Sequence, residues 1–203
     1  MRGRWPLTGT PLAAHDRGMK VVSMHTYAAP PDVVFDAMTD PAVLAEKYAA
    51  LGHRNIEIIE HSASRVGVAV HSRRDVPMDV PGFARRLLSP TNTVEQRDTW
   101  GPATADGSRT GTWEVTARGV PVKVGGTLRL APAANGTIVE IRGDVTSSVP
   151  LIGGKLASFI GHDVERTMHA EEEFNDGHLS RVAPKPKPRR RNGDGTGGAG
   201  TGA

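Results

Sequence analysis

Cysteine is absent from this 203-residue chain, which excludes disulfide bonds, a cysteine nucleophile and thiolate metal sites. Aromatic residues are scarce, at 4% of the sequence. No apolar run approaches the roughly 18 residues of a membrane-spanning helix. The first 18 residues also lack the continuous apolar segment of a secretory signal. We therefore expect a cytoplasmic protein.

A large excess of one sign of charge is also missing, since 25 basic residues face 22 acidic ones and the net charge is only +3. Residues 1–18 hold three arginines and one aspartate, and residues 183–203 hold five basic residues and one aspartate. The stretch between them is therefore mildly acidic. This distribution does not favour a basic groove, so we expect no specific nucleic-acid recognition.

Composition divides the chain into three segments. Residues 19–182 carry the periodic patterns, and a domain of this length would bury roughly 70% of its unfolded surface. We expect residues 1–18 to be a disordered extension and residues 183–203 a disordered basic Pro/Gly-rich tail. The basic run at 185–191 could contact an anionic membrane surface or nucleic acid weakly, or remain solvated.

The most informative pattern is a long helix over residues 150–182. Pro150 and Gly153-Gly154 mark its start, and Pro184 stops it. At about 1.5 Å per residue, this helix would be about 50 Å long, more than is needed to close a core of this size. We expect it to lie along a curved sheet with a space between the two.

Shorter elements precede this helix. A helical pair is expected from Pro31 to Leu51, broken at Asp40-Pro41, and a short amphipathic helix after Pro81-Gly82. A Ser-Ala-Ser turn is expected at 62–64, and Gly126 and Gly143 suggest bulges or bends. Alternating patterns predict strands at 20–27, 55–61, 65–74, 93–100, 110–118, 121–130 and 137–147.

Several phrases of the sequence carry a family resemblance, namely those at 80–87, 126–128, 149–156 and 170–174. They are similar to the domain-of-unknown-function family 2505 (DUF2505), over about residues 19–182. The order of elements resembles the helix-grip fold of the START, or polyketide cyclase/dehydrase (SRPBCC), superfamily. The resemblance implies an α+β fold in which a curved antiparallel sheet of about seven strands wraps around the long carboxy-terminal helix. It transfers no catalytic motif.

A cavity between sheet and helix is the functional expectation, with a filled core as the alternative. The resemblance places Phe83 and Leu87 at its mouth, or in a cap over one end of the sheet. The residues predicted to bind a ligand are Val66, Val68, Val70, Phe83, Leu87, Trp113, Val115, Leu128, Val139, Ile141, Ile160, Val164, Thr167 and Glu171.

Glu171 is the most informative polar residue, because a carboxylate on an apolar helix stripe must be paired, protonated or hydrated. It could orient a polar ligand group, act as an acid or base, or reach an arginine. His162 and His169 fall on the opposite side of the helix and about 10 Å apart, so we expect solvated side chains. His178 falls on the apolar stripe near the helix end. We expect no metal and no cofactor.

These observations predict non-catalytic binding or transport of a small hydrophobic or amphipathic ligand, lipid- or polyketide-like. The first alternative is a cyclase- or hydrolase-type enzyme that uses the same cavity. The second is a protein-interaction module with a filled core. An enzyme predicts at least two polar groups that converge in the cavity, whereas the interaction module predicts no cavity.

Overall fold

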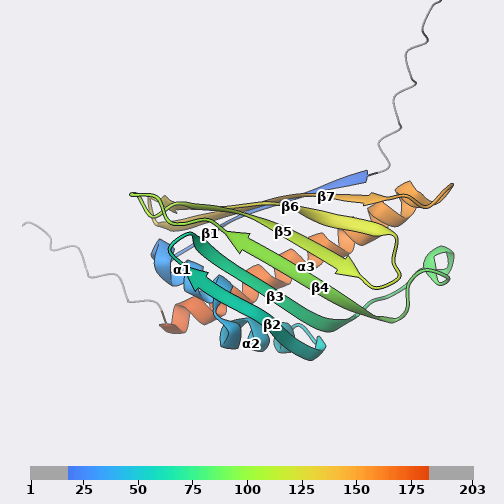
Figure 1. Cartoon of the computed structure of the whole chain (residues 1–203), viewed down its shortest axis with the longest axis horizontal. Coiled ribbons are helices and arrows are strands. Elements are labelled where there is room, and N and C mark those ends of the chain that lie inside the picture. Colours follow the sequence, from blue (N-terminus) through green and yellow to red (C-terminus); the bar gives the residue numbers. More distant parts are fainter. Residues whose placement is uncertain (1–17, 183–203) are drawn as a thin grey trace, which may run out of the picture.

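The computed structural model describes residues 18–182, which form one antiparallel sheet, two short helices and one long helix (Figure 1). The predictions for residues 1–17 and 183–203 lie outside these residues. The elements are β1 (Gly18–Tyr27), α1 (Pro31–Thr39), α2 (Pro41–Ala50), β2 (Arg54–Ser64), β3 (Gly67–Pro77), η1 (Gly82–Ala84), β4 (Thr91–Trp100), β5 (Arg109–Ala117), β6 (Val122–Ala133), β7 (Gly136–Ser147) and α3 (Gly153–Val182).

The sheet has seven strands in the order β1-β7-β6-β5-β4-β3-β2. Strands β2 to β7 are sequential neighbours, and β1 closes the order by pairing antiparallel with β7. The two edge strands, β1 and β2, are therefore joined in sequence only through α1 and α2. The predicted curved antiparallel sheet with a long carboxy-terminal helix is confirmed. No helix in the described part of the chain is both long and apolar enough to cross a bilayer.

The predicted break in the helical pair is confirmed at Asp40. Its carboxylate accepts hydrogen bonds from the backbone N–H groups of Ala42 at 2.8 Å and Val43 at 3.1 Å. Pro41, the first residue of α2, has no N–H to satisfy. This cap fixes where α2 begins and thereby places its side chains over one end of the sheet.

Two local predictions are wrong. The turn between β2 and β3 is formed by Arg65 and Val66 rather than by Ser62–Ser64, because β2 continues to Ser64. The segment after Pro81-Gly82 forms only the short 3-10 helix η1, followed by a turn. The apolar side chains there, Phe83 and Leu87, pack at the edge of the core without a regular helix.

Gly126 and Gly143 were predicted to mark bulges or bends; neither marks a bulge, since the pairing register runs unbroken through both positions. The bulges lie instead in β2, where the register shifts twice between Arg54 and Glu60. Gly143 lacks a side chain because the Trp113 indole occupies that space: a Cβ atom there would lie 2.5 Å from the ring. The indole N–H also donates to the Arg142 carbonyl oxygen at 3.1 Å.

Helix α3 begins at Gly153, three residues later than predicted, and spans 30 residues, or about 45 Å. It packs mainly against β1 and β7. Gly161 permits this close approach, because a Cβ atom there would lie 2.4 Å from the Met19 sulfur of β1. Along the last turns, Asn175 and Leu179 are buried, whereas the predicted Phe174 and His178 are only half-buried and stack on each other. The buried stripe is therefore displaced by one position.

Candidate functional site

A cavity of about 160 Å³ lies between α3 and the inner face of the sheet. Its sheet walls come from β3, β4, β5 and β6, with Ile141 as the only contribution from β7. Among the described residues, none of β1 or β2 lines it. Helix α3 packs against β1 and β7, and the cavity lies between α3 and the other strands, which the helix does not contact closely.

Eight of the fourteen residues predicted to bind a ligand line this cavity. They come from the central strands and from the middle of α3: Trp113, Val115, Leu128, Ile141, Ile160, Val164, Thr167 and Glu171. Their positions follow the two periodicities from which they were predicted, alternation in the strands and helical spacing in α3. Binding by these residues stays a prediction.

The other six do not line the cavity, for local reasons. Val66 lies in the β2–β3 turn and is 82% exposed. Val68 and Val70 face inward but pack with Leu44 and Tyr48 of α2, which covers that end of β3. The remaining three pack within the main hydrophobic core: Phe83, Leu87 and Val139.

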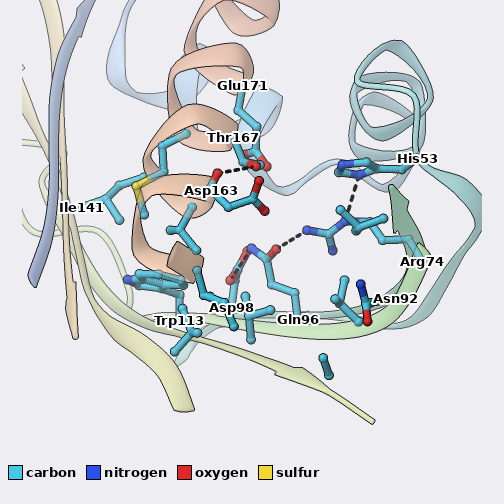
Figure 2. A pocket seen from close by; sticks show the side chains of 18 of the residues that line it. His53, Arg74, Asn92, Gln96, Asp98, Trp113, Ile141, Asp163, Thr167 and Glu171 are labelled. Carbon is cyan, nitrogen blue, oxygen red and sulfur yellow. Dashed lines mark hydrogen bonds between the residues drawn. The ribbon is translucent and has the colours of Figure 1, made fainter. Parts of the chain in front are cut away.

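One end of the cavity is charged, as Figure 2 shows for Glu171 and Arg74, and Asp98 lies between Gln96 and Trp113. Lys47 of α2 donates to Glu171 of α3 at 2.8 Å, and their side chains are 5% and 22% exposed. Burial alone would raise the pKa of Glu171, but the Lys47 and Arg74 cations lower it below its ordinary value. Burial would likewise lower the pKa of Lys47, but the Glu171 carboxylate raises it. Both groups therefore stay charged at neutral pH.

Arg74 of β3 organises the neighbouring polar groups. Its guanidinium donates to His53 Nδ1 at 3.2 Å, to Ser72 Oγ at 3.1 Å and to Gln96 Oε1 at 2.7 Å. Its guanidinium carbon also lies 3.9 Å from the centre of the Tyr48 ring. A buried arginine with these partners is fixed in one orientation.

His53 is held in its neutral form. Burial and the nearby Arg74 cation lower its pKa to about 4. Because Nδ1 accepts from Arg74, the ring proton sits on Nε2. His53 is thus a neutral hydrogen-bonding group at the edge of the cavity at physiological pH.

Asp98 differs from the other carboxylates in the cavity. Its two oxygens each accept from the Gln96 amide at 3.1 Å, and no cation of the described chain lies within 4.0 Å. Burial raises its pKa to about 6. Asp163, by contrast, forms an ion pair with Arg166 of the same helix.

Several of these polar residues were missed by the sequence analysis, although signals existed. Arg74 is in phase with Val70 in β3, and Asp98 is in phase with Val94 and Trp100 in β4. Alternation alone would have placed both inside. Lys47 lies one helical turn after Val43, on the apolar side of α2. His53 follows α2 in a loop, where no periodicity predicts direction.

The histidines considered for metal binding lie elsewhere. His162 and His169 are exposed on the outer face of α3, as predicted. Within residues 18–182, no group of three or more histidine, aspartate or glutamate side chains is arranged to hold a metal ion. The chemistry available in the cavity is therefore that of charged pairs, amides and apolar walls.

Solved structures with the same arrangement of elements have low sequence identity to this chain. The STAR-related lipid transfer protein (fragment 25–204) from Xanthomonas axonopodis is 18% identical, with a TM-score of 0.54 over 78% of this chain and 84% of that one. Ara h 8.0201 is 14% identical, with a TM-score of 0.53 over 81% and 99%. TTHA0849 from Thermus thermophilus is also 14% identical, with a TM-score of 0.53 over 81% and 100%.

These likenesses show the fold. None of the curated proteins matches the chain. The family model described as "Protein of unknown function (DUF2505)" matches residues 23–179, which is most of the described structure. The chain therefore belongs to the DUF2505 family, and its sheet and α3 form a helix-grip fold like that of these solved structures.

Proposed function

We propose that the protein binds a small amphipathic molecule in the cavity between the sheet and α3, without reacting with it. The observation that carries this proposal is the division of the cavity into an apolar end and a charged end. Figure 2 shows Trp113 and Ile141 on one side of the cavity and His53 and Arg74 on the other. Such a division suits a ligand that has one apolar part and one polar group.

The size of the cavity limits what it can enclose. A cavity of about 150 Å³ holds a benzene ring, whereas sites for drug-sized ligands are roughly 300–1,000 Å³. At about 160 Å³, this cavity encloses about one ring or a short chain. A lipid- or polyketide-like molecule would place only such a part inside it, with the remainder beyond the charged end.

Energetics require the polar end to contribute. Burying about 150 Å² of apolar ligand surface supplies about 4 kcal/mol, which corresponds to roughly millimolar affinity. Tighter binding therefore needs hydrogen bonds or ion pairs with the charged end. The name of the Xanthomonas protein, a lipid transfer protein of the same fold, supports a ligand-binding role by analogy of fold.

An enzyme is the second candidate, and a specific observation favours it. Two carboxylates in one cavity have pKa values displaced in opposite directions, with Asp98 raised and Glu171 lowered. This is the pattern of a general acid beside a permanent anion. The filled-core interaction module, in contrast, predicted no cavity, and the structure contains one.

The first test is native mass spectrometry of the purified full chain, followed by solvent extraction of any bound molecule. A stoichiometric passenger supports binding, and its unchanged recovery after incubation with the protein supports a non-catalytic role. Conversion of the bound molecule into a product would contradict non-catalytic binding and favour the second candidate, an enzyme.

A pair of variants tests the location of the site, with benzyl alcohol as the probe in calorimetric titration. Val164→Phe fills the cavity from α3 and should weaken binding by at least about tenfold, the effect of losing about 1.4 kcal/mol. His162→Phe adds the same ring to the exposed face of α3 and should leave binding unchanged. Equal affinity in the two variants would place the site elsewhere.

A further inference from the structure

The charged groups that line the cavity are unevenly paired. The lining carboxylates are Asp98, Asp163 and Glu171, and the lining cations of the described chain are Lys47 and Arg74. His53, the lining histidine, is neutral at physiological pH because its pKa is lowered to about 4. With Asp163 paired with Arg166, two carboxylates and two cations remain, but only Lys47 and Glu171 are in direct contact with each other.

Both cations are already engaged by the protein. Lys47 is paired with Glu171 at 2.8 Å. Arg74 donates to His53, Ser72 and Gln96. An anionic ligand at Lys47 would have to displace Glu171, and breaking that pair would leave a carboxylate uncompensated inside the protein.

The carboxylate without a cation in direct contact is Asp98. Asp163 is neutralised by Arg166, and Glu171 by Lys47. Asp98 is held only by the amide of Gln96, whose orientation is fixed because its oxygen accepts from Arg74. An ionised carboxylate offers about four lone-pair positions, so Asp98 keeps acceptor capacity for a ligand.

The surroundings of Asp98 suit an amine in particular. Asp98 on β4 is directly paired with Trp113 on β5, and both side chains line the cavity (Figure 2). Directly opposed side chains in an antiparallel pair have Cβ atoms about 4.5–5.5 Å apart. The Asp98 carboxylate and the apolar wall formed by Trp113 therefore share one region of the cavity, so an amine paired with Asp98 can pack its ring or chain on that wall.

We infer that the polar group of the ligand is a protonated amine that pairs with Asp98, while its ring or short chain packs beside Trp113. This inference rests on the proposed function, since it names the ligand class of the same cavity. The assigned ligand is thus a small aromatic or aliphatic amine.

The protonation state of Asp98 is compatible with this pairing. Its pKa of about 6 leaves most of the carboxylate ionised at pH 7.5. The charged groups that face it are Glu171 of α3, Lys47 of α2 and Arg74 of β3, with Asp163 also in the cavity. A bound ammonium would place a cation in direct contact with Asp98, which no side chain of residues 18–182 does.

Three probes of nearly equal size test the inference at pH 7.5 with the purified full chain: benzylamine, benzyl alcohol and benzoate. Calorimetric titration should show benzylamine binding about tenfold more tightly than benzyl alcohol, the usual gain from a charge-assisted hydrogen bond, and benzoate binding more weakly than either. Asp98→Asn should weaken benzylamine about tenfold and change benzyl alcohol by less than about twofold. Asp163→Asn is the matched control and should preserve the preference, because Arg166 already neutralises Asp163.

The outcomes separate the two claims. If benzyl alcohol binds in the cavity but benzylamine binds no more tightly, the amine assignment is overturned while ligand binding stands. If none of the three probes binds the wild-type protein, both claims fall. The comparison of the three probes on the wild-type protein needs no variant, so the inference can still be refuted if Asp98→Asn folds poorly.

Discussion

The two sides of α3 make different kinds of contact with the same sheet. Towards β1 and β7, which we call the closed half, Gly161 lets the helix approach Met19, and Asn175 donates to the Tyr27 hydroxyl at 3.4 Å. Towards β3–β6, the open half, the helix presents Val164 and Glu171 to a cavity. The difference shows how one long helix can anchor the fold along one side and form a binding site along the other.

The largest expected effect comes from breaking the charged pair that joins α2 to the open half. Lys47→Met leaves Glu171 without its counter-charge, and we expect the free energy of unfolding to fall by about 3 kcal/mol. The double variant Lys47→Met/Glu171→Leu removes both charges and should recover most of that loss. Urea denaturation of the three proteins measures this, and a double variant no more stable than the single one would contradict the account.

A second pair of variants compares the two halves directly. Val145 of β7 is fully buried, so Val145→Ala should lower the free energy of unfolding by about 2 kcal/mol. Val115 of β5 lines the cavity, and Val115→Ala should lower it by less than about 1 kcal/mol, because one side of the residue already lacks packing partners. Equal losses in urea denaturation would mean that the open half is packed as tightly as the closed half.

The smallest expected effect concerns Asp98 and depends on pH. Because its pKa is raised from 3.8 to about 6, the folded state binds more protons than the unfolded state between these values. The contribution of Asp98 to the free energy of unfolding therefore becomes less favourable as pH rises from 3.8 to about 6, and it is least favourable above pH 6. A shift of about two pKa units corresponds to at most about 3 kcal/mol. Because the substitution also removes the charged acceptor of the Gln96 amide, Asp98→Asn should stabilise the protein by about 1 kcal/mol at pH 7.5 and by nothing near pH 3.5.

Denaturation curves at the two pH values check this difference, with Asp163→Asn as the control. Asp163 is paired with Arg166, so its replacement should not stabilise the protein at pH 7.5. A gain from Asp98→Asn that is equal at both pH values would show that the carboxylate is not destabilised by burial.

Periodicity predicted most of the strands and α3, because each has one buried face, and the family resemblance supplied their arrangement. Periodicity also predicted the apolar part of the cavity, including Trp113 and Val164. Arg74 and Asp98 also follow strand alternation, because each is in phase with buried neighbours of its own strand. A charged side chain is not expected at an inward position, however, unless the group that pairs with it is known. Those partners lie on other elements and are brought together only by the fold.

Other features had no periodic signal. Val70 faces inward as predicted, yet α2 covers it, and a pattern within one strand does not say which helix lies above it. The unbroken strand at Gly143 depends on an indole that reaches it from two strands away. The volume of the cavity likewise depends on side-chain packing between distant segments.

The position of the tryptophans gives the protein its own optical reporter. Of the three in the chain, Trp100 and Trp113 both line the cavity, and Trp5 lies outside the described residues. Any molecule that displaces water from this space changes the polarity around both indoles at once. The intrinsic fluorescence of the unlabelled protein should therefore shift in wavelength when the cavity fills, so ligand searches need neither a dye nor an assay of turnover.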